Sequence, residues 1–133
     1  MARILIIDDS ATSRDIIAHI LATAGHHVVK VASAAEGLKE HQRNPVEVVI
    51  TDIFMPETDG YETIRLFRSV RPEPKILAIS GGGDFAGRCV LEVAEKFGAF
   101  GGLRKPIQSD QLTETVRLCL AESPNGRANG AVD

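Results

Sequence analysis

Short apolar runs that stop abruptly on aspartates are the feature of this sequence that most restricts its fold. Residues 4–7 read Ile-Leu-Ile-Ile and are followed by Asp8 and Asp9, and the Val-Val-Ile-Thr of residues 48–51 is followed directly by Asp52. An unbroken run of this length is typical of a strand covered on both faces, because a solvated face would carry polar residues at alternate positions. Charged groups are costly to bury. We therefore expect these aspartates to lie where buried strands reach the surface.

Strand-like and helix-like patterns alternate along the chain. Apolar or β-branched runs predict strands over residues 4–7, 26–31, 46–51, 75–79 and 99–103. Between them apolar residues recur at helical spacing, which predicts helices after a cap at Asp9 or Ser10 and over residues 33–43, 60–70, 85–97 and 108–121. The expected inward-facing residues of the first, fourth and fifth helices are Ile16, Ile17, Ile20, Leu21, Ala24, Val90, Val93, Ala94, Phe97, Leu112, Val116 and Cys119.

Five strands that alternate with five helices predict a doubly wound α/β fold, in which one five-stranded parallel sheet carries helices on both faces. Right-handed crossovers restrict how such a chain can wind, and one common solution has the strand order 2-1-3-4-5. The first and third strands are then neighbours, with the topological switch point between them. Ligands of such sheets bind at the carboxyl ends of the strands beside that point, so we expect the functional site there.

The length and charge of the chain restrict its class further. At 133 residues it has the size of one domain, which we expect to span residues 1–121. Residues 122–133 are rich in Pro, Asn, Gly and Ala and predict a disordered tail. The net charge of −3 argues against a surface built to coat nucleic acid. No apolar run approaches the roughly 18 residues needed to cross a bilayer, so we expect no membrane insertion and a cytoplasmic location.

The cysteines and histidines do not follow a metal-binding spacing. Cys89 and Cys119 are far apart in the sequence and no Cys-x-x-Cys accompanies them. We interpret both as small hydrophobes on helices. His26 and His27 are adjacent and would point to opposite faces of a strand, and we predict that none of the four histidines is a metal ligand.

The predicted strand order brings several polar residues to one edge of the sheet. Asp8 and Asp9 follow the first strand, Asp52 the third, Ser80 the fourth and Lys105 the fifth. Two carboxylates about 5 Å apart repel by roughly 3 kcal/mol at an effective dielectric constant of about 20, so protonation, the lysine or a metal ion must offset the repulsion. Carboxylate oxygens with water in the other positions suit Mg²⁺ best. A metal, a free carboxylate and a lysine together favour phosphoryl transfer.

These residues resemble the receiver domains of two-component response regulators. Residues 6–10 (Ile-Ile-Asp-Asp-Ser) are similar to the family's acidic pair after its first strand, and residues 52–60 (Asp-Ile-Phe-Met-Pro-Glu-Thr-Asp-Gly) to its phosphoacceptor loop. Ser80 stands where the family places its hydroxyl, and Lys105-Pro106 resembles the family's lysine followed by a cis-proline. The resemblance covers residues 3–121 and implies a flavodoxin-like (βα)5 fold.

The resemblance implies a role for each of these residues. Asp52 would take the phosphoryl group from a phosphohistidine, Lys105 would hold a phosphoryl oxygen, and Ser80 would move toward the phosphate. Mg²⁺ would be bound directly by Asp9, Asp52 and the backbone carbonyl of Phe54, and by Asp8 mainly through water. A cis bond before Pro106 would aim Lys105.

The resemblance also implies a signalling role without substrate turnover. We expect a free-standing, single-domain response regulator, a phosphoprotein that receives its phosphoryl group from a sensor histidine kinase or a histidine phosphotransfer protein. Its output would be binding of a downstream protein through the face of the fourth helix, fifth strand and fifth helix, with Arg88, Phe100 and Arg104 as candidate contacts. Two alternatives stay open: a phosphorelay intermediate that passes the group to a histidine phosphotransfer protein, and an adaptor that is never phosphorylated.

The sequence departs from the family at one position. The family usually has an aromatic residue three positions before the lysine, which swings inward with the hydroxyl, and here that residue is Gly102. Phe100 could substitute only in part. We expect the phosphorylation chemistry to survive and hypothesise that the signal travels through the glycine-rich loop after Ser80. Unchanged amide resonances over residues 81–100 on phosphorylation would contradict this hypothesis.

Other interpretations of these residues carry less weight. Residues 81–86 (Gly-Gly-Gly-Asp-Phe-Ala) match a dinucleotide-binding pattern, but no acidic residue for a ribose follows about 20 residues later. An aspartyl phosphatase would need a carboxylate two positions after Asp52, where Phe54 stands. Asp8 to Ser10 could simply cap a helix, and Arg14 reads as a surface residue of the first helix.

Overall fold

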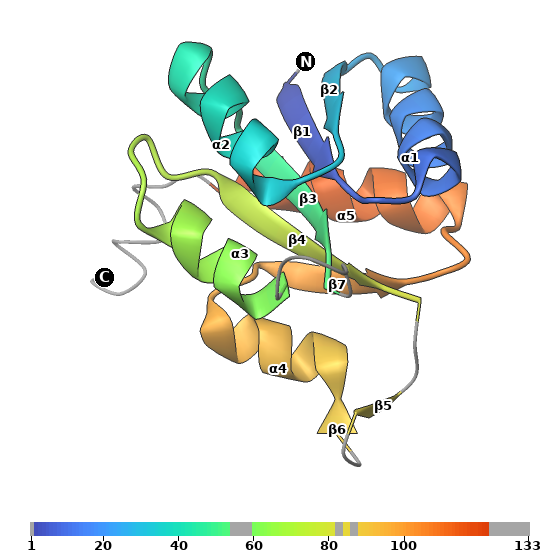
Figure 1. Cartoon of the computed structure of the whole chain (residues 1–133). Coiled ribbons are helices and arrows are strands. Elements are labelled where there is room, and N and C mark those ends of the chain that lie inside the picture. The colour runs from blue at the N-terminus through green and yellow to red at the C-terminus, as the bar shows by residue number, and fades with distance from the viewer. Residues whose placement is uncertain (1, 54–59, 82–83, 86–87, 123–133) are drawn as a thin grey trace.

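A five-stranded parallel sheet lies between two layers of helices in the computed structural model, which describes residues 2–53, 60–81, 84–85 and 88–122 (Figure 1). The sheet order is β2-β1-β3-β4-β7, and each neighbouring pair is parallel. This confirms the predicted order 2-1-3-4-5, with β7 as the fifth strand of the sheet. The strands are β1 (Arg3–Ile7), β2 (His27–Val31), β3 (Val48–Asp52), β4 (Lys75–Ser80) and β7 (Gly101–Arg104).

Helices cover both faces of the sheet. In Figure 1, α1 and α5 lie on one face and α2, α3 and α4 on the other. The bounds of the helices are α1 (Ala11–Thr23), α2 (Ala34–Arg43), α3 (Gly60–Arg68), α4 (Val90–Phe97) and α5 (Ser109–Ala121). Among these described helices none is long and apolar enough to span a membrane.

Polar side chains and glycines set the helix ends. Ser10 caps α1 by accepting a hydrogen bond from the backbone N–H of Ser13 at 3.3 Å, and Ser33 caps α2 in the same way. Gly25 follows α1 with a φ of +99°, a conformation that side chains with a Cβ rarely adopt. The predicted cap and the predicted end of the first helix are therefore both confirmed.

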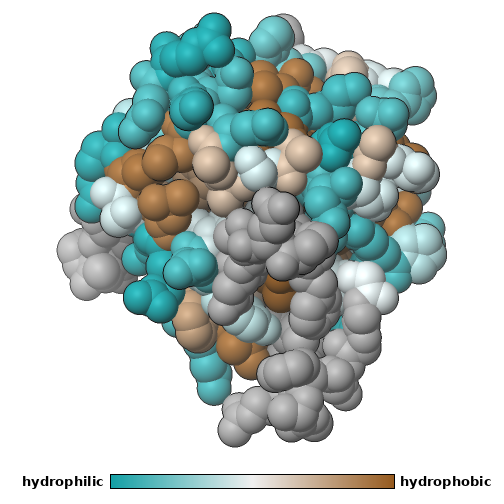
Figure 2. Space-filling model, in the orientation of Figure 1, coloured by the Kyte–Doolittle hydropathy of each residue, from teal (hydrophilic) through white to brown (hydrophobic). Residues whose placement is uncertain are grey.

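Successive strand residues alternate between two cores, one on each face of the sheet. On the α1 and α5 side lie Ile4, Ile6, Val48, Ile50, Leu77 and Ile79 with Ile17, Leu21, Leu112, Val116 and Cys119. On the opposite side lie Leu5, Ile7, Val49, Ile76 and Ala78 with Ile64, Phe67, Leu91 and Ala94. The unbroken apolar runs exist because both faces of each strand are buried. On the face seen in Figure 2, the coloured surface is largely hydrophilic and is interrupted by smaller apolar patches.

The structure corrects several predicted boundaries and burials. The fourth helix begins at Val90, and the short antiparallel strands β5 (Asp84–Phe85) and β6 (Arg88–Cys89) precede it, because a segment opened by glycines is a poor helix start. Ile16 and Phe97, predicted to face inward, are 49% and 39% exposed. Ile16 lies at the rim of the stripe formed by Ile17 and Leu21, and the Phe97 ring packs 5.0 Å from that of Tyr61 on α3.

The third and fifth strands are also shifted from their predicted bounds. β3 runs from Val48 to Asp52 because its pairing with β1 begins at Val48. β7 begins at Gly101, two residues later than predicted. The predicted tail begins at Glu122, which directly follows α5 and pairs with Lys75, whereas its residues 123–133 lie outside the described residues, as does Phe54.

Candidate functional site

Three carboxylates meet at the carboxyl ends of β1 and β3. The register pairs Ile7 with Thr51, so the residues that follow, Asp8 and Asp52, lie side by side. Carboxylate oxygens of Asp8, Asp9 and Asp52 all lie within 4.8 Å of one another. Asp8 and Asp52 are 1% and 6% exposed, whereas Asp9 is exposed. The predicted acidic cluster therefore forms at the predicted switch point.

The backbone and side chain of Asp8 are held from several directions. Its N–H donates to the carbonyl of Val31 at 3.3 Å, and its Oδ1 accepts from the N–H of Ser10 at 2.9 Å. Its Oδ2 is buried and receives no well-aligned hydrogen bond from the described residues, although Nζ of Lys105 lies 3.1 Å away. A buried carboxylate oxygen with spare lone pairs is suited to a cation.

Lys105 supplies a positive charge between the two buried carboxylates. Its Nζ lies 3.1 Å from Oδ2 of Asp8 and donates to Oδ2 of Asp52 at 3.2 Å. Burial of the ammonium lowers the pKa of Lys105, but the close contacts with the negatively charged Asp8 and Asp52 carboxylates outweigh burial and raise it. The side chain is consequently a firmly protonated cation at neutral pH. The Lys105–Pro106 bond is cis, as predicted.

Ser80 lies at the end of β4, between the strands that carry Asp52 and Lys105. It is fully buried, and its carbonyl accepts the backbone N–H of Lys105 at 2.9 Å. A Cβ at Gly81 would meet Cδ of Lys105 at 3.3 Å, so the lysine side chain passes directly over this glycine. The predicted hydroxyl and the predicted ammonium thus belong to the same end of the sheet as the carboxylates.

Arg14 is a site residue that the sequence interpretation missed. Its Nη1 donates to the backbone carbonyl of Asp8 at 2.7 Å, and the residue is half-buried. The prediction that Arg14 is simply a surface residue of the first helix is therefore wrong. The one sequence feature that could have indicated this contact is the position of Arg14 in the first turn after the Ser10 cap, because that turn lies over the end of β1. Helical periodicity alone could not show this contact.

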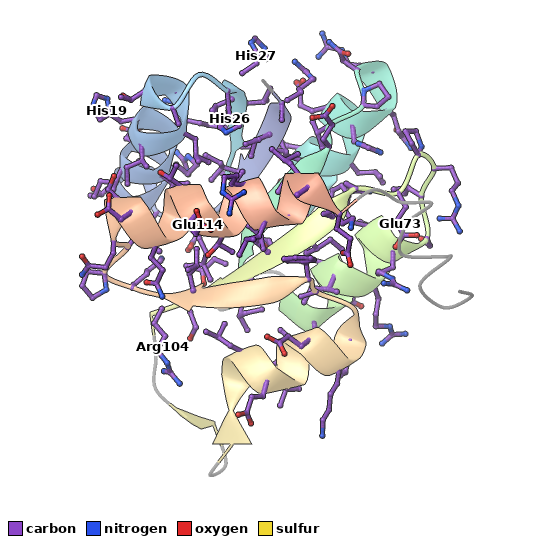
Figure 3. All side chains as sticks on the ribbon, turned by 180° about the vertical axis from the view of Figure 1, so that it is seen from behind. His19, His26, His27, Glu73, Arg104 and Glu114 are labelled. Atoms are coloured by element: carbon purple, nitrogen blue, oxygen red, sulfur yellow. The ribbon has the colours of Figure 1, made fainter. Side chains whose placement is uncertain are left out.

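The donor set fits a hard divalent cation. Carboxylate oxygens are the ligands that Mg²⁺ and Ca²⁺ prefer, and Asp8 Oδ2 is a buried oxygen without a well-aligned hydrogen bond from the described residues. The fourth predicted ligand, the carbonyl of Phe54, lies outside the described residues. Three histidines labelled in Figure 3 lie away from the carboxyl end of the sheet: His19 on α1, His26 directly before β2, and His27 at its first position.

Gly102 lies directly beneath α4. A Cβ placed on it would lie 2.8 Å from Cδ2 and 3.1 Å from Cβ of Leu91, so helix and strand are in close contact there. Phe100 does not take the place of the missing aromatic residue, because its ring lies 5.4 Å from Nζ of Lys75 at the start of β4. On the predicted partner face, Arg104 is exposed on β7 (Figure 3), and the side chain of Arg88 is outside the described part of the chain.

Comparison with known proteins places the chain among signalling proteins. A family model described as "Response regulator receiver domain" matches residues 4–117. The chain is 31% identical over 115 residues to the chemotaxis protein CheY of Thermotoga maritima, covering 86% of this chain and 93% of that protein. It is 29% identical to the transcriptional regulatory protein GlrR of Escherichia coli, covering 92% of this chain but only 27% of GlrR. The crystal structure of a response regulator receiver domain protein from Clostridium thermocellum is similar with a TM-score of 0.81 and 32% identity, over 91% of this chain and 95% of that one.

Proposed function

The chain belongs to the response regulator receiver domain family, and on that premise we propose that it is a phosphorylation switch whose phosphoacceptor is Asp52. The observation that carries the proposal is the placement of Asp52 at the end of a buried strand, within 4.8 Å of two other carboxylates and 3.2 Å from Lys105. A rigid strand end presents a nucleophile in a fixed position, which lowers the entropic cost of reaching the transition state. Ser80, on the adjacent strand, is proposed to contact the phosphoryl group.

The proposed reaction is transfer from a phosphohistidine. An oxygen of Asp52 forms a bond to phosphorus while the bond between phosphorus and the imidazole nitrogen breaks, and that nitrogen keeps the electron pair and later binds a proton. Lys105 is proposed to neutralise part of the charge on the phosphoryl oxygens. No substrate is turned over in the process, and the protein itself is the product.

Mg²⁺ is the proposed metal, held directly by Asp9, Asp52 and the carbonyl of Phe54, and by Asp8 mainly through water. When bound, it would supply positive charge that the clustered carboxylates and a phosphoryl group require. The spare lone pairs of Asp8 Oδ2 support this assignment.

Phosphorylation-dependent protein binding is the proposed output. The proposed donors are a sensor histidine kinase or a histidine phosphotransfer protein, and the proposed binding face consists of α4, β7 and α5. The alternative of a phosphorelay intermediate is not favoured, since the chain is similar over most of its length to chemotaxis proteins named CheY. A cytoplasmic location stays a prediction.

Intact-mass measurement after incubation with acetyl phosphate tests the proposal directly. We expect the wild type to gain the mass of one phosphoryl group in the presence of Mg²⁺ and not in EDTA. Asp52→Asn should gain none, whereas Asp15→Asn, an exposed aspartate on α1, should behave like the wild type. A phosphoryl group on Asp52→Asn, or none on the wild type, would rule out Asp52 as the acceptor.

A further inference from the structure

The contact between Arg14 and the end of β1 has no place in the function proposed above. Nη1 of Arg14 donates to the carbonyl of Asp8 at 2.7 Å, a short distance typical of a charge-assisted hydrogen bond. The side chain is half-buried, although it lies in the first turns of a surface helix. Ordering a long cationic side chain costs rotamer entropy, which this short hydrogen bond must offset.

This hydrogen bond fixes the orientation of the peptide that joins Asp8 to Asp9. The other backbone polar group of Asp8, its N–H, donates to the carbonyl of Val31 on the neighbouring strand. Because a peptide unit is planar, holding the carbonyl of Asp8 also fixes the direction of the N–H of Asp9 and the start of that residue. Together with the hydrogen bonds to Val31 and Ser10, Arg14 therefore helps to set how the chain leaves β1 and enters the acidic cluster.

Asp9 depends on this orientation more than the other two carboxylates do. Asp8 is held through Oδ1 by Ser10, and Asp52 is held through Oδ2 by Lys105. Asp9 is exposed, and within the described part of the chain no hydrogen bond or ion pair to its carboxylate is seen. Its place within 4.8 Å of the other two follows from the course of the backbone.

We propose that Arg14 is a positioning residue for the metal site, which presents Asp8 and Asp9 to a divalent cation by holding the peptide between them. The inference rests on the proposed Mg²⁺ site. Groups that orient metal ligands from outside the coordination sphere typically contribute 10- to 100-fold to metal affinity. Arg14 would do this from the backbone side of the ligands, without touching the ion.

Removal of Arg14 distinguishes a positioning role from a purely electrostatic one, because the two roles predict opposite changes in the affinity for Mg²⁺. If the guanidinium acted only as a nearby positive charge, its removal would strengthen binding of Mg²⁺, since like charges repel. If it positions the carboxylates, its removal weakens binding despite the lost repulsion. The same experiment therefore separates the two roles without any measurement of phosphorylation.

The test is isothermal titration of Mg²⁺ into the wild type and the variants Arg14→Met, Arg14→Lys and Arg117→Met. We expect Arg14→Met to bind Mg²⁺ about tenfold more weakly than the wild type. Arg14→Lys should lie between the two, because its ammonium can donate one hydrogen bond. Arg117 is an exposed arginine on α5 and serves as the matched control, with unchanged affinity expected. NMR shifts of the Asp9 and Ser10 amides should change in metal-free Arg14→Met and not in Arg117→Met.

Unchanged or tighter binding of Mg²⁺ by Arg14→Met would overturn the inference. If that variant does not fold, as judged by circular dichroism, Arg14→Lys decides: weaker binding than the wild type supports positioning, and equal or tighter binding excludes it. Failure of the wild type itself to bind Mg²⁺ would instead overturn the proposed metal site, on which the inference rests.

Discussion

The two ends of the sheet differ in how their charged side chains are paired. At the amino end, charged and polar groups are matched: Glu73 lies between Arg68 and Arg71 at 3.1 and 3.7 Å, and Lys75 pairs with Glu122 at 2.7 Å. At the carboxyl end, three carboxylates gather around the ammonium of Lys105. The same strands thus run from a neutralised edge to an edge with an excess of negative charge.

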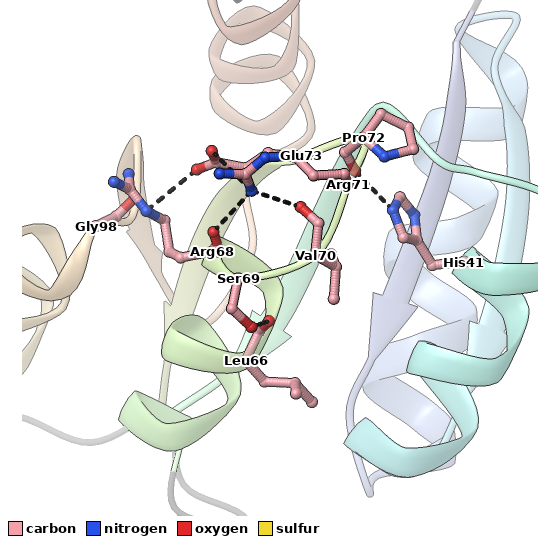
Figure 4. Close-up of polar contacts among 9 residues, drawn as sticks. All are labelled: His41, Leu66, Arg68, Ser69, Val70, Arg71, Pro72, Glu73 and Gly98. Atoms are coloured by element: carbon pink, nitrogen blue, oxygen red, sulfur yellow. Dashed lines mark hydrogen bonds and ion pairs between the residues drawn. The ribbon is translucent and has the colours of Figure 1, made fainter.

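At the amino end, both ring nitrogens of the buried His41 have hydrogen-bond partners. Its Nδ1 accepts the backbone N–H of Val46 at 3.0 Å, so its Nε2 carries the hydrogen and donates to the carbonyl of Pro72 at 2.8 Å (Figure 4). The ring is buried and meets Phe67 edge to face. One side chain thereby joins the end of α2, the start of β3 and the loop before β4.

The difference separates structural polar groups from functional ones. Repulsion between clustered carboxylates lowers the stability of the metal-free fold, and no folding argument requires three of them together. Matched contacts at the amino end help to offset that cost. If this division is correct, changes at the amino end should alter stability alone, and changes at the carboxyl end should alter the response to metal.

The largest effect on stability is expected from His41→Ala at the amino end. Loss of the ring leaves a cavity beside Phe67 and two backbone groups, the N–H of Val46 and the carbonyl of Pro72, without their partner. We expect the free energy of unfolding in urea to fall by about 3 kcal/mol. The exposed His19→Ala is the control, with a change of less than about 0.5 kcal/mol. A loss for His41→Ala as small as that of His19→Ala would show that the amino end does not stabilise the fold.

Binding of Mg²⁺ at the carboxyl end should change the free energy of unfolding somewhat less than His41→Ala does. At a concentration one hundred times its Kd, a ligand of the folded state adds about 2.7 kcal/mol to the free energy of unfolding. We expect this increment in the wild type and unchanged in His41→Ala, measured by urea unfolding with and without Mg²⁺. Asp9→Asn should lose most of the increment, yet be more stable without metal by up to about 1 kcal/mol, because one repelling charge is gone. An equal metal response in Asp9→Asn and the wild type would contradict the proposed ligand set.

The smallest effect on stability is expected at alkaline pH, because Lys105 is partly exposed. The pKa of Lys105 is raised in the folded protein, so its stabilisation is complete below the ordinary lysine value of about 10.4 and is lost as the pH rises through the raised value. Titration of the Lys105 side chain by NMR should show this raised pKa, and Asp8→Asn should lower it. A pKa unchanged by Asp8→Asn would mean that Asp8 does not contribute to holding the ammonium.

Sequence patterns predicted those parts of the molecule that depend on single strands and their ends. Asp8, Asp9, Asp52 and Lys105 were identifiable because each stands at or just after the end of a strand, and the strand order brings those ends together. The contact of Arg14 was not predicted, since it depends on where a helix turn lies over a neighbouring strand end. The contacts of His41 join residues up to 31 positions apart in the sequence, and no local pattern encodes such pairs.

The close approach of Gly102 and Leu91 limits which residues can replace either of them. A Cβ at position 102 would lie 2.8 Å from Cδ2 and 3.1 Å from Cβ of Leu91, so an aromatic side chain there would require Leu91 to move. Leu91→Ala alone, in turn, would leave a cavity beside β7. We therefore expect each single change to be unfavourable, and an aromatic residue at position 102 to be tolerated better when position 91 is smaller than leucine. We therefore expect positions 91 and 102, on α4 and β7, to covary among sequences of this family.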